Sequence, residues 1–398
     1  MPMQSETIEA RRAAAVPSRE ELLSRAEKLV PVLRARSETC EQLRRCPDET
    51  IADFHATGLL KICQPARYGG YELGWDIRSE VGQILAHGCG SQAWVQHILT
   101  DHTQKLGAFP IAAQDDVWGE DPDTRIAAGL DPVGKARRVA GGVIYSGRHG
   151  FSSGIDHVEW LICGGHIFDD GKPAQRCYFL VPKSDAVVID DWQVMGLCGT
   201  GSKSFEIRDA FVPTHRILDG NAAEEGTGPG TEVHRAPVFK MPFTSLAATG
   251  FAAIAVGIAE GFLADWLAYM KDRKSRGVAV AELMGTQISA GAAAVQIAAA
   301  QRLYLDAARE AMTTLARGET LGMKQRLHAR LRSSFACQAS LEAVQRLFNA
   351  AGGRALYTRN GLQRQVRDLQ AAAAHISVAW DSAASGYGSY LLGIEGSP

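Results

Sequence analysis

The feature that most constrains the fold of this chain is a change of hydrophobic period along its 398 residues. From Ser18 onward, apolar residues recur at helical spacing, and Ser18 and Glu21 have the spacing of a capping box. From about Thr124 the pattern changes to short β-rich runs such as GGVIYSG and RCYFLVP, separated by glycine, aspartate and proline. After a glycine-rich linker at 226–235, long alanine-rich helical segments return. The order predicts a helical region, a β region and a second helical region.

We expect these regions to form separate parts of the molecule. The predicted parts are a flexible leader (1–17), an N-terminal helical domain (18–123), a middle β domain (124–233) and a C-terminal helical bundle (234–398). The β domain reads as a small barrel or sandwich. Four helices are expected in the bundle, at 243–274, 280–317, 323–350 and 359–392. Their small and apolar faces exceed what one bundle buries, which favours self-association.

The charge balance restricts the partners that this chain is suited to bind. Its 42 Lys and Arg residues nearly match its 44 Asp and Glu residues, and the net charge is −2. The cationic side chains are scattered, so neither nucleic acid nor an anionic membrane is expected as a partner. Because 46% of the residues are hydrophobic, the chain can bury a large core. No apolar run marks a signal peptide or a membrane span, and we expect a cytoplasmic protein.

The cysteine and histidine spacings give no sign of a metal site. None of the eight cysteines forms a CxxC pair, which favours reduced thiols over disulfides or zinc ligands. The histidines likewise lack an i, i+4 pair with a carboxylate partner. We therefore expect no metal cofactor.

The stretch GRHGFSSGIDHVEW, at 147–160, contains the most suggestive local pattern. Ser152 and Ser153 lie between an aromatic residue, Phe151, and Gly154, in β-rich sequence. Hydroxyl and backbone N–H groups on such a turn can approach a flat polar ring closely. An ordinary hairpin turn would have the same composition, so this pattern alone leaves both interpretations open.

Two histidines and a second glycine-rich stretch are further candidates. His102 shares a helical stripe with Val95 and Leu99, and His375 lies in alanine-rich helical sequence, so either is compatible with a buried core position. The GTGSKS stretch at 199–204 includes Ser202 and could contact a cofactor. It is not a nucleotide fingerprint, because it lacks a third glycine and a βαβ context.

Four segments in a fixed order resemble one family. GLLKICQPARYGGYE, EDPDTRIAAGLDPVGKA, SGRHGFSSGIDHVEW and LQRQVRDLQAAAAHIS are similar to segments of the two-component, flavin-dependent aromatic monooxygenases. Examples are the oxygenase components that act on p-hydroxyphenylacetate and on a secosteroid phenol. The resemblance spans nearly the whole chain and implies an α+β, acyl-CoA dehydrogenase-like fold with a helical domain, a middle β-barrel domain and a C-terminal four-helix bundle.

This resemblance also implies a reaction. Reduced flavin and O₂ would form a flavin-4a-hydroperoxide that hydroxylates a phenol-like aromatic molecule. Ser153, or its neighbour Ser152, would hydrogen-bond the central nitrogen of the flavin and slow the loss of peroxide. His102 would face the phenol and accept or share its proton. His375 would lie over the flavin and donate a hydrogen bond.

Binding of the cofactor and substrate follows from the same resemblance. Arg273 would bind the flavin pyrophosphate across a subunit interface, in a homotetramer, and Arg276 is an alternative for the same role. The Gly352-Gly353 pair would let backbone approach the phosphates, unless it is only a helix C-cap, and both features favour FADH2 over FMNH2. Phe151 and Ser202 are further candidates for flavin contacts. Trp94, Phe109 and Trp380 are candidates for the walls of the substrate pocket, although each could equally belong to the core. His149 departs from the tryptophan of many relatives.

The chain has no GxGxxG between a strand and a helix, and no other nicotinamide site. The resemblance therefore implies a separate NAD(P)H:flavin reductase as the source of reduced flavin.

Alternative functions remain open at this level. An acyl-CoA dehydrogenase needs a glutamate base shortly after an Arg-Asp pair, but after Arg367-Asp368 that position holds Ile376. A dehydrogenase would therefore need an unusual base, and Glu260 is the nearest carboxylate. Oxygenation of nitrogen or sulfur by the same fold is a second alternative. A third is a protein that kept the fold and lost the flavin.

Overall fold

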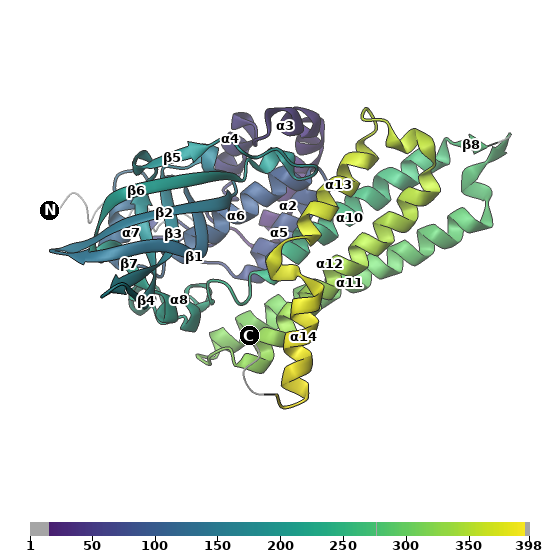
Figure 1. The fold of residues 1–398 in the computed structure, drawn as a ribbon. Coiled ribbons are helices and arrows are strands. Elements are labelled where there is room, and N and C mark those ends of the chain that lie inside the picture. The colour runs from purple at the N-terminus through teal and green to yellow at the C-terminus, as the bar shows by residue number, and fades with distance from the viewer. Residues whose placement is uncertain (1–15, 276, 395–398) are drawn as a thin grey trace.

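The computed structural model describes residues 16–275 and 277–394, so most of the predicted leader and Arg276 lie outside the described residues. The N-terminal helices are α2 (Arg19–Ala35), α3 (Ser37–Leu43), α4 (Asp48–Ala56), α5 (Trp75–Ala86), α6 (Gly90–Leu106) and α7 (Ile111–Trp118). Ser18 caps α2, and its side chain accepts a hydrogen bond from the N–H of Glu21, as the capping pattern predicts. Helices α5 and α6 lie between the sheet and the C-terminal bundle (Figure 1).

A curved seven-stranded sheet forms the middle of the molecule. Its strands are β1 (Ile126–Val139), β2 (Gly142–Ser152), β3 (Trp160–Asp169), β4 (Lys172–Pro182), β5 (Ala186–Ile189), β6 (Lys203–Pro213) and β7 (Ile217–Asp219). Their order is β5-β6-β2-β1-β3-β4-β7, and β1 and β3 form the parallel pair in this otherwise antiparallel sheet. The β-rich runs GGVIYSG and RCYFLVP became β2 and β4, and β7 is an edge strand that the sequence did not indicate. This arrangement places the end of β2 beside the start of β6.

The C-terminal region is a bundle of long helices. These are α10 (Ala248–Lys271), α11 (Met284–Ala316), α12 (Met323–Ala351), α13 (Gly361–Ala373) and α14 (Trp380–Leu391). Helices α10 to α13 pack together, and α14 packs on α12 (Figure 1). Two short helices, α8 (Gly220–Glu225) and α9 (Gly230–Val233), connect the sheet to the bundle, and β8 (Lys274–Ser275) and β9 (Val278–Ala279) pair beyond α10.

Short 3₁₀ turns complete the described structure. They are η1 (Ala66–Tyr68), η2 (Ile155–His157), η3 (Lys183–Asp185), η4 (Cys198–Thr200), η5 (Thr214–Arg216), η6 (Pro237–Lys240), η7 (Val280–Glu282), η8 (Gly353–Leu356) and η9 (Ile376–Val378).

The predicted last helix, 359–392, is wrong in its extent. The chain forms two helices there, because α13 ends at Ala373 and η9 separates it from α14. At the break, the imidazole of His375 accepts a hydrogen bond from the N–H of Ser377, in the manner of a helix cap. The break turns His375 from a helical position into a corner between two helices.

Helix α10 is the central helix of the bundle. By length and composition it is the one described helix apolar enough to cross a membrane, but 67% of its apolar window is buried inside the protein. Its small residues allow close approach of α5, since a Cβ at Gly257 would meet the carbonyl of Gln83. Faces of α10 and α11 are among those that suggested self-association, and the face of α10 is therefore used within the chain. The other, on α11, leaves Ile288 and Val295 exposed by 63% and 68%.

Candidate active site

A tight turn after β2 places two serines differently. Ser152 ends the strand, and Gly154 has a φ of +72°, a conformation that favours glycine. A Cβ at Gly154 would lie 3.3 Å from Cγ1 of Val95, so the turn rests directly on α6. Phe151 also has a positive φ, of +57°, and is exposed, with its ring edge-to-face against Trp192.

The hydroxyl of Ser153 begins a line of three hydroxyls, which we call the hydroxyl chain. Oγ of Ser153 lies 2.8 Å from Oγ of Ser202, which lies 2.7 Å from Oγ1 of Thr200. Oγ1 of Thr200 donates to the carbonyl of Leu197 over 2.8 Å. At the other end, the indole Nε1–H of Trp94 donates to Oγ of Ser153 over 3.0 Å. The hydroxyl chain therefore joins α6 to the turns after β2 and before β6.

Ser152 is not part of this chain. Its side chain is fully buried, and its Oγ has no hydrogen-bond partner within residues 16–275 and 277–394. An unpartnered buried hydroxyl is uncommon and marks a place where a ligand group or a water is needed. Both serines thus remain suited to a polar ligand, Ser153 as part of a network and Ser152 as a separate group.

Three aromatic side chains gather beside the hydroxyl chain. Trp94 of α6 stacks on Phe251 of α10 at 4.8 Å between ring centroids, and Phe251 lies 3.9 Å from the ring of His375. Trp94 and His375 are 5.7 Å apart. Rings from three separate elements thus form an apolar wall next to hydroxyl groups, which suits a ligand that is flat, aromatic and polar at its edge.

His375 has a defined hydrogen-bonding role within this wall. Its Nδ1 accepts from the N–H of Ser377 over 3.2 Å, so the neutral ring carries its proton on Nε2. Burial lowers the pKa of His375 to about 4, which keeps the imidazole neutral at pH 7. His375 therefore presents a hydrogen-bond donor at Nε2.

His102 has the opposite arrangement. Its Nδ1 lies 2.9 Å from the carbonyl of Ile126, which can only accept, so Nδ1 carries the proton and Nε2 is free to accept. Burial is the main cause that lowers the pKa of His102 to about 4, while the nearby Asp101 carboxylate opposes the change. His102 is therefore a neutral imidazole whose Nε2 can take up a proton.

A buried group of charges lies next to His102. The carboxylate of Asp101 contacts the guanidinium of Arg78 at 2.5 Å and Nζ of Lys105 at 2.9 Å. All three residues are less than a tenth exposed. The guanidinium of Arg78 also stacks over the ring of Trp75 at 4.1 Å. Two buried cations thus share one carboxylate, whose pKa they hold far below its usual value.

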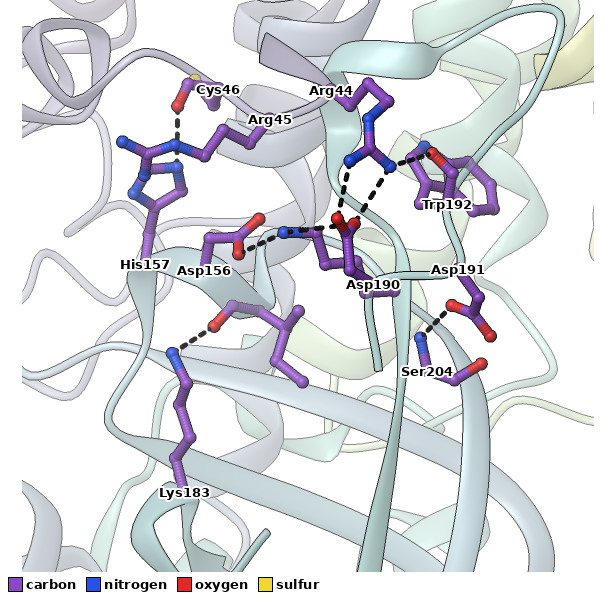
Figure 2. Close-up of polar contacts among 12 residues, drawn as sticks. Arg44, Arg45, Cys46, Asp156, His157, Lys183, Asp190, Asp191, Trp192 and Ser204 are labelled. Carbon is purple, nitrogen blue, oxygen red and sulfur yellow. Dashed lines mark hydrogen bonds and ion pairs between the residues drawn. The ribbon is translucent and has the colours of Figure 1, made fainter. Parts of the chain in front are cut away.

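A network of polar contacts fixes the chain around the serine turn against the region of α3 and α4 (Figure 2). Nζ of Lys203 lies 2.7 Å from the carboxylate of Asp156, and Nε2 of His157 hydrogen-bonds the carbonyl of Cys46 at 2.8 Å. Arg44 forms a two-pronged ion pair with Asp190. His157 therefore supports the loop, and the network ties the sheet to the region of α3 and α4.

Helix α13 holds the loop before β6 from the opposite side. The carboxylate of Asp368 accepts the N–H of Leu197 over 2.6 Å. Arg367 donates to the carbonyl of Met195 over 2.5 Å. Burial raises the pKa of Asp368 to about 6. Sequence reasoning used the Arg-Asp pair only as a marker and missed this role, because the partner loop lies about 170 residues away.

The structure brings Arg273 and Gly352 together. Arg273 donates to the carbonyls of Ala350 and Ala351 at the end of α12, at 3.1 and 2.5 Å. Gly352 is the C-cap of α12 with a φ of +72°, and a Cβ there would meet the guanidinium. Gly353 begins η8, with open space around its Cα. These residues form one element, at the end of the bundle away from the sheet (Figure 1).

The other predicted residues lie outside the hydroxyl and aromatic cluster. Phe109 is fully buried in a second core, with Trp118 and Ile126, and this position favours a packing role over a pocket wall. Trp380 is 39% exposed and packs on Phe335. His149 is buried inside the sheet, where Tyr145 hydrogen-bonds it at 2.6 Å.

Cavities also lie outside the ring cluster. A cavity of about 700 Å³ lies between α11 and α12, lined by charged residues such as Arg309, Glu310 and Lys324. None of its lining residues belongs to the ring cluster of Trp94, Phe251 and His375, so we do not assign the chemistry to it. A cavity of about 20 Å³ lies beside Leu99 and Thr103 of α6. Within the described ranges, no three His, Cys, Asp or Glu side chains are grouped to hold a metal ion.

Comparison with known proteins identifies similar chains. Residues 249–380 match the family model "Acyl-CoA dehydrogenase, C-terminal domain". The oxygenase subunit HsaA of a flavin-dependent monooxygenase from Rhodococcus jostii is 34% identical, over 89% of this chain and 93% of the relative. The oxygenase component of an FADH2-dependent resorcinol hydroxylase from a Rhizobium species is 33% identical, over 94% of each.

A solved structure is similar over almost the whole fold. The crystal structure of 3-HSA hydroxylase from Rhodococcus sp. RHA1 has a TM-score of 0.91 and 34% identity to this chain. The match covers 95% of this chain and 98% of the other.

Proposed function

The chain belongs to the flavin-dependent monooxygenases of the acyl-CoA dehydrogenase fold, a family that includes the oxygenase components of two-component systems. We propose that it hydroxylates a phenol-like aromatic molecule at the junction of the sheet and the bundle. The family and the fold expected from the sequence are thus confirmed. Its co-substrates are reduced flavin and O₂. The observation that carries the substrate proposal is His102, a neutral buried imidazole with a free acceptor nitrogen.

The residues at the junction fit a flavin. The hydroxyl of Ser153 and the unpartnered hydroxyl of Ser152 match the polar edge of the ring, and Trp94, Phe251 and His375 match its flat faces. Reduced flavin, when bound, supplies the electrons that activate O₂. The residues of the chain bind and orient it, and the aromatic wall keeps water away from it.

His102 would act on the substrate. Its Nε2 accepts the phenolic proton, and the resulting phenolate ring is a stronger nucleophile. The hydrogen bond from Nδ1–H to the carbonyl of Ile126 holds the ring in the tautomer that this transfer needs. Asp101, next in the chain, favours the protonated imidazole that forms.

His375 would act on the oxygen side of the reaction. Its Nε2–H donates a hydrogen bond to an oxygen atom that gains electron density, and its Nδ1 is held by the N–H of Ser377. The break between α13 and α14 is what aims this side chain at Trp94 and Phe251. His102 and His375 thus have complementary roles, one as proton acceptor and one as donor.

The Arg273–Gly352 element would bind the phosphates of FAD, which favours FADH2 over FMNH2. About 30 Å of helix, at 1.5 Å per residue, separates Phe251 from Lys271 at the end of α10, and Arg273 follows two residues later. This separation supports the idea that Arg273 serves a flavin held mainly by another copy of the chain, in a homotetramer. The exposed face of α11 offers apolar surface for such packing.

A separate NAD(P)H:flavin reductase would provide the reduced flavin, and both proteins would work in the cytoplasm. Support comes from the two-component relatives and from the missing nicotinamide fingerprint in the sequence.

A dehydrogenase reaction is disfavoured by the positions of the possible bases. Ile376, at the position where a dehydrogenase has its glutamate, has no ionisable group. The carboxylate of Glu260 is engaged by Gln83 at 2.6 Å and His87 at 2.7 Å, where α10 meets α5. Oxygenation of nitrogen or sulfur needs no base, so the role of His102 distinguishes it from phenol hydroxylation.

The test combines product analysis with one variant and a control. The protein, photoreduced FAD and a panel of phenols are mixed with O₂, and hydroxylated products are measured by mass spectrometry. His102→Ala should lose at least a hundredfold in rate of product formation, the usual size of a general-base contribution, while flavin binding persists. His166→Ala, on the sheet, should be unaffected. Equal loss of rate on an amine or sulfide substrate would refute the proton-transfer role.

A further inference from the structure

The hydroxyl chain contains as many hydroxyl protons as it has oxygen–oxygen contacts to fill. It contains three hydroxyl protons, one each on Ser153, Ser202 and Thr200. It also contains three oxygen–oxygen contacts, from Ser153 to Ser202, from Ser202 to Thr200, and from Thr200 to the carbonyl of Leu197. Each contact is 2.7 or 2.8 Å long, a distance at which two oxygens repel unless a proton lies between them. All three protons are therefore used within the chain.

The direction of the protons follows from the two ends. The carbonyl of Leu197 can only accept, so Thr200 donates to it and must accept from Ser202. Ser202 must then accept from Ser153. The Nε1–H of Trp94 can only donate, and it occupies one of the two lone pairs of Ser153. Ser153 therefore has one free lone pair to offer a ligand and no free proton.

We propose that the hydroxyl chain makes Ser153 a hydrogen-bond acceptor only, and that Thr200 and Ser202 thereby select reduced over oxidised flavin. This inference rests on the proposed function, in which Ser153 faces the central nitrogen of the flavin. That nitrogen carries a hydrogen in reduced flavin and a lone pair in oxidised flavin. The remaining lone pair of Ser153 can accept a hydrogen bond from the N–H of reduced flavin, but it repels the nitrogen lone pair of oxidised flavin.

Burial strengthens this selection. Thr200 is 1% exposed, Ser202 5% and Ser153 7%, so water is a poor substitute for a lost partner within the chain. To donate to oxidised flavin, Ser153 would have to leave one oxygen–oxygen contact without a proton. A mismatch of this kind corresponds to roughly a tenfold or larger difference in affinity. Thr200 acts as a positioning residue, because it reaches the flavin only through Ser202 and Ser153.

Two variants free a proton, and one does not. Thr200→Val keeps the shape and leaves two protons for the single contact between Ser202 and Ser153. Ser202→Ala leaves the proton of Ser153 without an acceptor. Thr249→Val, the control, removes a buried hydroxyl that donates to the carbonyl of Leu246, and it leaves three protons for the three contacts of the hydroxyl chain. The first two variants should lose selectivity, and the third should keep it.

The experiment measures the dissociation constants of oxidised and photoreduced FAD, by anaerobic titration of the full chain followed by absorbance and fluorescence. The dissociation constant of oxidised FAD divided by that of reduced FAD should fall roughly tenfold in Thr200→Val and Ser202→Ala, mainly because the variants bind oxidised FAD more tightly. The potential of the bound flavin should fall by about 30 mV for each tenfold loss, since the couple transfers two electrons. Thr249→Val should retain the wild-type ratio.

The outcomes separate this inference from the proposed function. If the wild-type chain binds neither form of FAD, the proposed function fails. If the wild-type chain selects reduced FAD but Thr200→Val and Ser202→Ala select it equally well, only the proton-count inference is overturned. Circular dichroism of each variant shows whether it is folded, and either of the two proton-freeing variants suffices for the test.

Discussion

Replacing Asp101 tests whether its carboxylate is needed to neutralise the two buried cations beside His102. Its carboxylate serves both Arg78 and Lys105, and none of the three side chains is more than about a tenth exposed. At an effective dielectric constant of about 20, the attraction across 2.9 Å is about 6 kcal/mol, and desolvation offsets part of it. We expect Asp101→Asn to lower the free energy of unfolding by about 3–5 kcal/mol, because two buried cations lose their counterion.

Lys105→Met should behave differently. It leaves Arg78 and Asp101 as a neutral pair, and methionine replaces most of the apolar stem of the lysine. The lost contacts of Nζ with the rings of Trp75 and Phe243 are each worth roughly 0.5–1 kcal/mol. We expect a loss below about 2 kcal/mol, clearly smaller than that of Asp101→Asn.

Urea unfolding followed by circular dichroism compares these variants. Glu310→Gln is the control, since it breaks a well-formed pair with Arg332 whose carboxylate side is 53% exposed, and it should change stability by less than about 1 kcal/mol. If Lys105→Met destabilises the protein as much as Asp101→Asn, the excess of buried positive charge is not the controlling factor and our reasoning is refuted.

Three further predictions concern the turn, the loop clamp and the buried histidines. Gly154→Ala should lower stability by more than the roughly 1–2 kcal/mol expected of Gly171→Ala, because both have a positive φ but only Gly154 has neighbours within 4 Å; equal Tm losses would contradict this. At pH 7.5, Asp368→Asn should raise the unfolding free energy, by up to about 3 kcal/mol, since it removes a buried charge whose pKa is raised to about 6 and keeps an acceptor for the loop N–H; a loss measured by urea unfolding would show that the charge itself is needed. Burial lowers the pKa values of His102 and His149 to about 4, so the unfolded chain binds more protons below pH 6.5 and stability falls as the pH falls towards 4. His149→Phe should reduce that slope by about 1.4 kcal/mol per pH unit, and an unchanged slope in unfolding titrations would argue that His149 is charged in the native state.

The sequence by itself determined the type and order of most elements of this fold. Helical periodicity located α2 and α6, and the capping pattern at Ser18 marked the start of α2, because these signals depend on residues only three or four positions apart. The β-rich runs became strands for the same local reason. The segments that revealed the family are likewise contiguous, and so Ser153, His102 and His375 could be named as candidates before their surroundings were known.

Only the tertiary structure decided what these residues can do. The hydroxyl chain joins Ser153 to Thr200 and Ser202, and no local pattern predicts contacts between turns that are about 50 residues apart. The tautomers of His102 and His375 depend on the carbonyl of Ile126 and the N–H of Ser377, and the second of these exists because the chain breaks the expected helix. Proton direction and charge are properties of the partners that packing brings within hydrogen-bonding distance, and a sequence specifies those partners only through the complete fold.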